Sequence, residues 1–467
     1  MEVHSAGQLK QLLNGEIVVG REDLLVTDAV SISKHIFSKD AQHLLVFLKE
    51  KKHLNWQAID LLNSAVVITD QYYRQFDKLS DCTIILVKNI EEAYWKFVNY
   101  YHDRFEIPII AVTGTSGKTT VKEMIKHILQ FKYKVNSTVS SFNNVYQSFN
   151  YLVGIDDETE VGVFETAVGR PGDVTKHCKY FRPSIGIITN IGEYHLDLCK
   201  TVDRYIEAKA ELVNCLNSNG VLLLNSDDEK TKKISLQNFH GKVIYFGLSE
   251  NADYRASDII FRENGMESTL HFDNKEWLIV IPSFGEHQVY NALTAIAAVH
   301  TVGVEIAEAI ERLKSYQDVE RHLEQVIGLN GATIIDDTWN MNPVSLKAAI
   351  KVLGQISSEE KAKKVIIGDM KKLADRSLAI NREIGQIIAG SDIDTLVTIG
   401  EISKEISVEA ELKGFKGKLY TFAKYEDIYS QLNSIVNSES IVLVKGIMGS
   451  KDMAKLTRSL RGNRKQD

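Results

Sequence analysis

The chain of 467 residues is poor in cysteine and proline and contains no long hydrophobic run. Its four cysteines, Cys82, Cys178, Cys199 and Cys215, form no CxxC pair, so they indicate reduced thiols rather than a disulfide framework. No apolar run approaches the ~18 residues that a membrane-spanning helix requires. The first residues, MEVHSAGQLK, contain no apolar signal core. We therefore expect a cytoplasmic protein without a membrane span.

An excess of positive charge is also absent. Aspartate and glutamate number 62 against 55 lysines and arginines, which gives a net charge of −7. This balance argues against a nucleic acid as the main ligand. The hydrophobic content of 44% and the charged content of 25% are ordinary for a globular protein. The length allows about three domains, each able to bury its own core.

The prolines divide the chain into regions of different character, since none precedes Pro108 and none follows Pro343. In both outer regions short apolar runs, such as SAVVITD and KVIIGDM, alternate with polar helical stretches. The pattern predicts an α/β protein of three domains. We expect a small N-terminal α/β domain, a central parallel-sheet domain with a phosphate loop, and a Rossmann-like C-terminal α/β domain, at residues 1–104, 105–314 and 315–467.

The stretch IIAVTGTSGKTTVKEM, residues 109–124, carries the strongest indication of a ligand. An apolar strand precedes GTSGKT and a helical pattern follows it, which is the context that a phosphate-binding loop requires. Gly114 and Gly117 let successive N–H groups turn toward phosphate oxygens at the positive end of the helix. Lys118 would supply a cation to the phosphates, and Thr119 a hydroxyl for magnesium. The alternative is a glycine-rich turn with a surface lysine.

Three further polar residues follow or lie near predicted strand ends. Glu165 ends the run VGVFE, His195 follows IGIITNIGEY, and Lys209 lies on a predicted helix fourteen residues after His195. Ligands collect where parallel strands end. Taken singly, each residue also fits a structural or solvent-exposed role. His195 and Cys199 at i,i+4 are compatible with zinc, but no further Cys/His cluster supports that.

Taken in order, GTSGKTT, ETAVGRPGD (165–173), ITNIGEYH, EAKAE, GEHQVYNALTAIAA (285–298) and IDDTWNMNP (335–343) resemble the Mur ligase family, which shares this loop with folylpolyglutamate synthases. The resemblance covers roughly residues 107–453. It is greatest to the branch that adds D-alanyl-D-alanine to a UDP-muramoyl tripeptide in peptidoglycan (cell wall) precursor synthesis. The usual phosphate-loop spacing GxxxxGK[ST] would place a glycine at position 112, where the chain has Val112. In the Mur ligase family the loop instead uses a glycine at the position of Gly114, so the resemblance accounts for this spacing.

The resemblance implies an ATP-dependent acid–amino-acid ligase that releases ADP and phosphate. An acceptor carboxylate takes the γ-phosphoryl group, and the amine of the donor attacks the acyl phosphate to form the C–N bond. Little covalent chemistry falls to the protein, so catalysis should depend on positioning and on charge stabilisation. We expect small-molecule or peptide substrates, no nucleic acid, and a monomer.

The resemblance also implies a set of site residues. One magnesium is expected at Thr119 and Glu165 and a second near His195. The lysine matching Lys209 is carbamylated in the family, which supplies the anionic oxygens that magnesium prefers. Asn143 and Asp336 match polar residues near the phosphates and the ribose. The expected site comprises the catalytic residues Lys118, Glu165, His195 and Lys209, the metal ligands Thr119, Glu165, His195 and Lys209, and the ATP-binding residues Gly114, Thr115, Ser116, Gly117, Lys118, Thr119, Thr120, Asn144, Asn291, Arg321 and Asp337.

Departures from the family pattern concentrate where substrates are expected. The N-terminal Asp-Ser-Arg segment is TDAVS here, which keeps Asp28 and lacks the arginine that suits a diphosphate. Trp339 replaces a tyrosine, and Lys372 replaces an acidic residue. Two alternatives therefore stay open: a Mur ligase paralogue that joins a different amino acid or peptide to a non-UDP carboxylate, and a non-ligating ATP-binding regulatory protein. Retention of Glu165 and of His195 with Lys209 argues against the second. A folate-type glutamate ligase fits the motifs less well.

Overall fold

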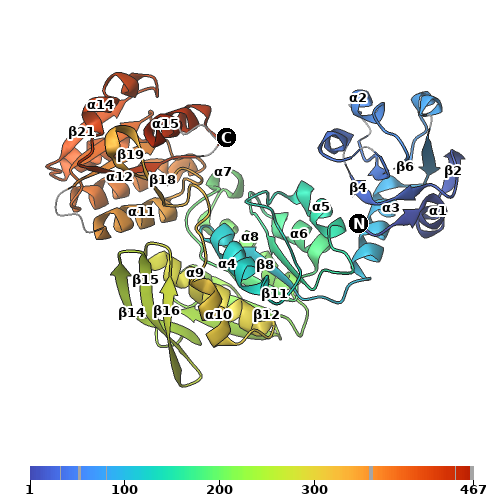
Figure 1. Ribbon diagram of the computed structural model, residues 1–467, viewed down its shortest axis with the longest axis horizontal. Coiled ribbons are helices and arrows are strands. Elements are labelled where there is room, and N and C mark those ends of the chain that lie inside the picture. The colour runs from blue at the N-terminus through green and yellow to red at the C-terminus, as the bar shows by residue number, and fades with distance from the viewer. Residues whose placement is uncertain are drawn as a thin grey trace. The chain divides into compact units, whose positions relative to one another are not determined.

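The computed structural model describes residues 1–31, 33–40, 42–50, 54–79, 81–356, 361–447 and 449–462. Helices and strands alternate along the chain, and the larger sheets consist mainly of parallel strands, which confirms the predicted α/β class (Figure 1). The chain forms two compact units. The first comprises Met1–Ala111, Lys132–Ala167 and Thr175–Ser184, and the second comprises Val112–Phe131, Val168–Val174 and Ile185–Asp467. Among the described helices, none combines the length and the apolar character needed to cross a bilayer.

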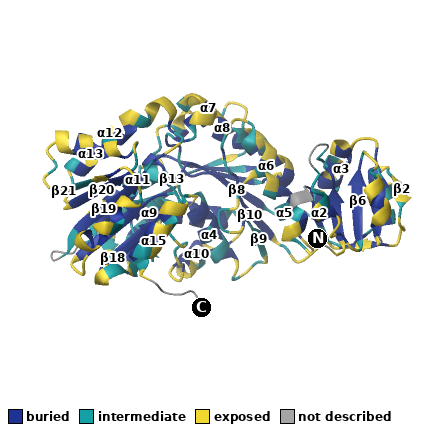
Figure 2. Ribbon diagram, turned by 90° about the horizontal axis from the view of Figure 1, so that it is seen from above, coloured by how far each residue is buried: buried dark blue, intermediate teal, exposed yellow. Residues whose placement is uncertain are grey.

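The first unit contains a five-stranded sheet with the order β2-β7-β6-β5-β4. Strand β2 runs antiparallel to β7, and the other neighbours are parallel. The central strands are buried on both faces (Figure 2), which explains why their sequences are continuous apolar runs such as AVVIT. The strands of this unit are β1 (His4–Ser5), β2 (Glu16–Val19), β3 (Leu25–Val26), β4 (Asp28–Val30), β5 (Leu44–Phe47), β6 (Ala65–Thr69), β7 (Cys82–Leu86), β9 (Val135–Ser137) and β10 (Val161–Glu165).

An aromatic core joins the helices of the first unit to its sheet. Phe47 of β5 contacts Tyr94, and Tyr94 contacts Phe149, with ring centroids 5.3 and 5.1 Å apart. The Tyr101 hydroxyl donates to the Ile155 carbonyl at 2.7 Å. Together these contacts fix α5 against α3. The helices that lie wholly or mostly in this unit are α1 (Ala6–Leu13), α2 (Trp56–Ile59), α3 (Ile90–His102), α5 (Ser148–Val153) and α6 (Asp173–Phe181).

The second unit begins inside β8 (Ile109–Thr113) and contains a sheet with the order β16-β15-β14-β13-β12-β11. Strands β11 to β14 are parallel, whereas β14, β15 and β16 form antiparallel hairpins. The tight turn before β16 uses Asp273 and Asn274 with φ of 50° and 56°, as a type I′ turn requires. These strands are β11 (Ile185–Ile188), β12 (Val221–Asn225), β13 (Lys242–Gly247), β14 (Tyr254–Arg262), β15 (Gly265–Phe272) and β16 (Lys275–Ile281), and the helices are α4 (Lys118–Leu129), α7 (Leu196–Cys199), α8 (Val202–Cys215), α9 (Glu286–Thr301) and α10 (Ile306–Leu313).

The same unit ends in a six-stranded sheet with the order β17-β18-β22-β19-β20-β21. Of the strands described in this sheet, β17 runs antiparallel to its neighbour and the others run parallel to theirs. Helices α11, α12 and α15 lie beside this sheet (Figure 1), and its central strands are buried (Figure 2). The strands are β17 (Glu324–Ile327), β18 (Thr333–Asp337), β19 (Ala362–Gly368), β20 (Thr395–Ile399), β21 (Lys418–Phe422) and β22 (Ser440–Lys445), and the helices are α11 (Pro343–Gln355), α12 (Ser377–Ala389), α13 (Lys404–Leu412), α14 (Leu432–Ile435) and α15 (Lys451–Arg461).

Candidate functional site

The loop between β8 and α4 requires both of its glycines. Gly114 has a φ of +147° and Gly117 a φ of +82°, conformations that side chains with a Cβ rarely adopt. A Cβ on Gly114 would lie 1.9 Å from Thr189 Oγ1, and a Cβ on Gly117 would lie 2.5 Å from Asn291 Oδ1. The loop therefore passes so close to β11 and α9 that only backbone fits, and Asn291 faces the start of α4.

Residues after β11 hold the loop in place. Ser116 N–H donates to Asn190 Oδ1, and Asn190 Nδ2 donates to the Ser116 carbonyl, both at 3.0 Å. Thr189 Oγ1 donates to the same carbonyl at 2.6 Å. Thr115 N–H donates to the Asn190 carbonyl at 2.9 Å, and Gly192 N–H to Thr115 Oγ1 at 2.8 Å. The sequence motifs alone do not identify Thr189 and Asn190 as supports of the loop, although their position at the end of a strand is a signal.

The first turn of α4 carries the charged and hydroxyl groups of the loop motif, Lys118, Thr119 and Thr120. Lys118 Nζ donates to the Thr115 carbonyl at 3.2 Å, so the ammonium folds back over the loop. Thr119 and Thr120 are buried. The N-terminus of this twelve-residue helix adds its positive end to the Lys118 charge. This arrangement can bind an anionic group such as a phosphate.

Lys209 is buried and lies against the phosphate loop. Its Nζ donates to the Gly114 carbonyl at 2.8 Å and lies 4.5 Å from the centroid of the Tyr205 ring. The Tyr205 hydroxyl in turn lies 3.2 Å from Thr115 Oγ1. Lysine is almost never buried without partners, so the alternative of an ordinary exposed helix lysine is wrong. Helix α8 thus adds a second ammonium group beside the loop.

His195 lies near both ammonium groups. It precedes α7 with a left-handed φ of 55°, and its ring centroid is 4.5 Å from that of Tyr194. Burial, assisted by the charges of Lys372, Lys209 and Lys118, lowers the pKa of His195 to about 3. Its Nδ1 is buried and has no hydrogen-bond partner among the residues that the structure describes. The imidazole is therefore neutral at physiological pH and has an unused nitrogen that suits a metal ion.

No group of three His, Cys, Asp or Glu side chains in the described ranges could enclose a metal ion by itself. Magnesium usually keeps several waters and is held by one or two protein ligands together with substrate phosphates. A threonine hydroxyl at the loop and the orphaned imidazole nitrogen of His195 fit that mode of binding. They do not fit a metal cage made of protein alone.

Glu165 and the asparagine pair belong to the first unit. Glu165 ends β10 and is buried, and Asn143 Nδ2 donates to its Oε1 at 2.6 Å. The Glu165 N–H donates to Thr138 Oγ1 at 2.9 Å, which fixes the end of the strand. Asn144 is exposed. Within this unit, the structure brings Asn143, rather than Asn144, to the carboxylate.

In α9 the Asn291 side chain is buried, and its Nδ2 donates to Gln288 Oε1 at 2.8 Å. Arg321 has a φ of +61° and lies with its Nε 3.5 Å from Glu320 Oε1. Its carbonyl accepts from Trp339 N–H at 3.3 Å, which joins it to the segment after β18. Asn291 thus lies by the loop, while Arg321 is paired with its sequence neighbour.

The acidic pair at the end of β18 already has basic partners. Asp336 is fully buried and accepts from Arg461 Nη1 at 2.8 Å. Asp337 forms an ion pair with Lys445, which lies opposite it in the register of β18 and β22. Asp336 is therefore a structural carboxylate, and Asp337 is held at the strand end by a buried lysine. Neither partner could be identified from the local motif.

Three contacts join the C-terminal sheet region to the loop and the His195 turn. Ser116 Oγ donates to Asn342 Oδ1 at 3.1 Å. Leu196 N–H donates to the Lys372 carbonyl at 2.9 Å. Arg376 Nε lies 2.9 Å from Glu193 Oε2. Burial lowers the pKa of the Lys372 ammonium, which lies 5.4 Å from the centroid of the Tyr194 ring.

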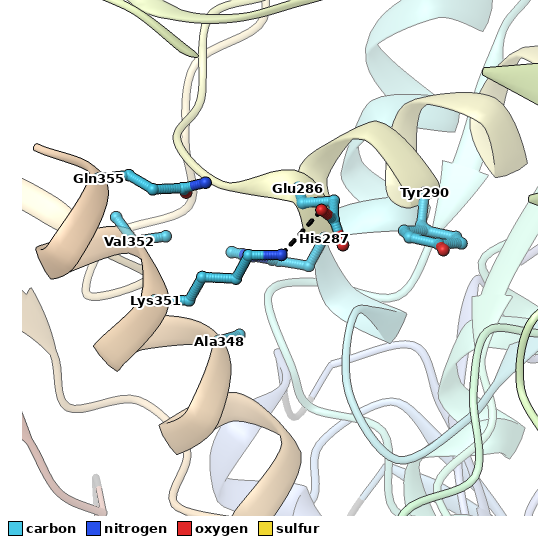
Figure 3. A pocket seen from close by; sticks show the side chains of 7 residues that line it. All are labelled: Glu286, His287, Tyr290, Ala348, Lys351, Val352 and Gln355. Carbon is cyan, nitrogen blue, oxygen red and sulfur yellow. Dashed lines mark hydrogen bonds and ion pairs between the residues drawn. The ribbon is translucent and has the colours of Figure 1, made fainter. Parts of the chain in front are cut away.

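A cavity of about 130 Å³ separates α9 from α11. Its two walls are joined by an ion pair between Lys351 and Glu286 at 2.8 Å (Figure 3). Burial and the charges of Lys445 and Lys351 lower the pKa of His287 to about 4, so its imidazole is neutral. The cavity was not predictable from the sequence, because its walls come from distant segments that meet only through tertiary packing. It is lined by Glu286, His287, Tyr290, Ala348, Lys351, Val352 and Gln355.

Comparison with known proteins agrees with this geometry. Residues 112–299 match the Mur ligase middle domain, and residues 322–448 match the Mur ligase, glutamate ligase domain. The UDP-N-acetylmuramoyl-tripeptide–D-alanyl-D-alanine ligase of Bacillus subtilis (strain 168) is 30% identical over 370 residues, which are 79% of this chain and 79% of that protein.

Two solved structures have the same fold. A crystal structure of MurF from Acinetobacter baumannii superposes with a TM-score of 0.84 at 23% identity, covering 98% of this chain and 99% of its own. The MurF ligase from Thermotoga maritima in complex with ADP gives a TM-score of 0.77 at 22% identity, covering 94% and 98%. The predicted resemblance and fold class are thereby confirmed. The chain belongs to the Mur ligase family and is an ATP-dependent ligase that forms an amide bond.

Proposed function

We propose that this ligase adds D-alanyl-D-alanine to a UDP-muramoyl tripeptide in the synthesis of peptidoglycan precursors. The Bacillus subtilis relative bears the name of this reaction and is similar over 79% of both chains. The observation that carries the proposal is the burial of Lys209 against the phosphate loop beside His195. A nucleotide-dependent switch needs a phosphate loop but has no use for these two additional groups.

The roles of the loop residues follow from their positions. The backbone from Gly114 to Thr120 and the N-terminus of α4 would bind the β- and γ-phosphates of ATP, and Lys118 would neutralise their charge. Asn291 lies close enough to Gly117 to meet the nucleotide beside the loop. On the family pattern, Asn144, Arg321 and Asp337 would also contact ATP.

Magnesium would neutralise charge between the phosphates and the acceptor. Thr119 and, on the family pattern, Glu165 would hold one ion, and the free nitrogen of His195 would bind at a second position. An unmodified Lys209 ammonium would repel a cation there, so we propose that Lys209 reacts with carbon dioxide. Its neutral amine would form a carbamate and release one proton, which converts a positive group into an anionic oxygen ligand.

In the reaction, a carboxylate oxygen of the acceptor attacks the γ-phosphorus as the bond to ADP breaks. The donor amine then attacks the acyl carbon, the C–N bond forms as the bond from that carbon to phosphate breaks, and the amine gives its proton to the departing phosphate or to water. Preorganised charge at Lys118 and at the helix N-terminus stabilises the transferring group. The contacts of Asn342 and Lys372 with the loop and the His195 turn would keep water from the acyl phosphate. We further propose that the enzyme acts as a cytoplasmic monomer.

One observation favours the alternative of a paralogue with a non-UDP acceptor. Asp28, the surviving residue of the N-terminal recognition segment, forms an ion pair with Lys39 at 2.7 Å. Its other oxygen accepts from the Ala29 N–H at 2.7 Å. This carboxylate is satisfied within the chain, and the arginine that suits a diphosphate is missing.

The decisive experiment incubates the purified protein with ATP and magnesium, and adds the tripeptide acceptor and D-alanyl-D-alanine separately and together. Phosphate release should require both, and mass spectrometry should show the pentapeptide product. Equal ATP turnover in the absence of both substrates would refute the ligase proposal. Turnover that occurs with a different acceptor, but not with the UDP-muramoyl tripeptide, would favour the paralogue. Lys209→Ala should lose activity that a short carboxylate partly restores, whereas Glu207→Ala, exposed on the same helix, should not.

A further inference from the structure

Lys372 is placed at the His195 turn by a constrained segment after β19. It has a left-handed φ of +69°, which is uncommon for a lysine. Its carbonyl accepts from Leu196 N–H at 2.9 Å. The start of the segment is fixed as well, because Asp369 Oδ1 accepts from Ser403 N–H at 2.8 Å. The backbone therefore carries the Lys372 side chain to one defined place.

The ammonium of Lys372 is half-buried, and among the described residues no carboxylate lies within ion-pair distance of it. Its Nζ lies 5.4 Å from the centroid of the Tyr194 ring, which itself lies beside His195. Across the described parts of the chain, no carboxylate forms an ion pair with it, although Arg376 four residues later pairs with Glu193 at 2.9 Å. The more distant Asp197 carboxylate attracts this ammonium, but burial outweighs that attraction and the buried charge costs free energy. A position of this kind suits an anion brought by a ligand.

We propose that Lys372 binds the carboxylate of the acceptor that becomes phosphorylated, and so acts as a specificity-determining and catalytic residue of this chain. The inference rests on the proposed ligase function. Lys118 already serves the nucleotide phosphates from the loop, whereas Lys372 comes from a separate segment on the side of His195. A carboxylate approaching a γ-phosphoryl group meets like charge, and an ammonium beside it reduces that repulsion. The family pattern has an acidic residue at the position of Lys372, so this carboxylate-binding role is specific to this chain and is not a feature of the family.

The test compares Lys372→Met with Lys372→Arg and with the control Lys371→Met. Lys371 is the exposed neighbour of Lys372, and its substitution by methionine removes the same charge. We expect Lys372→Met to raise the KM for the acceptor at least tenfold and to lower kcat, with the KM for ATP unchanged. Lys372→Arg should restore part of the loss, and Lys371→Met should behave as the unmodified enzyme. A merely structural role would not separate the two KM values. Equal effects in both methionine variants, or a change in the KM for ATP alone, would overturn the inference.

A binding measurement separates this inference from the proposed reaction. Calorimetry in the presence of magnesium and ADP would compare UDP-muramoyl tripeptide with the same molecule amidated at its terminal carboxylate. The unmodified protein should prefer the acid about tenfold or more, and Lys372→Met should abolish the preference. Equal binding of acid and amide by the unmodified protein would refute the role of Lys372. If the protein prefers the acid over the amide but shows no turnover, the proposed reaction is refuted and the carboxylate-binding role of Lys372 is supported.

Discussion

Replacing Gly114 by alanine should disable the phosphate loop through two separable costs. At a φ of +147° a residue with a Cβ is strained by about 1–3 kcal/mol. The new Cβ would lie 1.9 Å from Thr189 Oγ1, so that side chain must move and give up its 2.6 Å bond to the Ser116 carbonyl. Losing that bond costs about 1 kcal/mol. The sum of about 2–4 kcal/mol corresponds to roughly 30-fold or greater weakening of nucleotide binding.

Calorimetric titration with magnesium and ADP measures this loss. Gly414→Ala is the matched control. Gly414 has a φ of +83°, but no atom of the described residues lies within 4 Å of the position that its new methyl group would take, so the substitution adds only conformational strain. Thr189→Ala removes the hydroxyl alone. If the clash is the larger cost, Gly114→Ala combined with Thr189→Ala should bind ADP more tightly than Gly114→Ala alone. Unchanged ADP affinity in Gly114→Ala would refute the reasoning.

Three other variants test separate features. Burial raises the pKa of Asp318 from 3.8 to about 6, so the folded protein binds more protons between these values and its free energy of unfolding falls as the pH rises from 3.8 to about 6. Asp318→Asn should remove this fall and gain up to about 3 kcal/mol above pH 6, seen as a higher Tm; parallel Tm–pH curves for both proteins would contradict it. Lys445→Met leaves the buried Asp337 carboxylate unpaired and should cost about 3–5 kcal/mol, and adding Asp337→Asn should recover part of the lost Tm; no recovery would contradict the pairing. Ser116→Ala removes only the bond to Asn342, so kcat should fall by about two- to tenfold with ADP affinity unchanged, and the reverse pattern would argue against the link.

The local parts of the site were predictable from sequence. A strand, a glycine-rich turn and a helix with Lys118 at its start are encoded by neighbouring residues, and the structure has all three in place. The family and the fold class were predictable because several motifs occur in a fixed order. The domain bounds and the ligand roles of the site residues remain predictions.

Contacts between distant segments were not predictable. Asp337 meets Lys445 only because the register of β18 and β22 places them opposite each other, 108 residues apart. Thr189 supports the loop because β11 ends beside it. Lys209 looked like a surface residue when taken alone, since its burial depends on Tyr205 and on the carbonyl of a loop far away in sequence. Tertiary packing, rather than local preference, determines each of these contacts.

The bond between Leu196 N–H and the Lys372 carbonyl limits how this ligase can be recombined with its relatives. An engineer who exchanges the C-terminal third to change the amino donor would also exchange the backbone that supports the turn carrying His195. Chimeras should therefore take residues 193–197 and 369–376 from the same parent, and junctions that separate the two segments should yield folded but inactive hybrids.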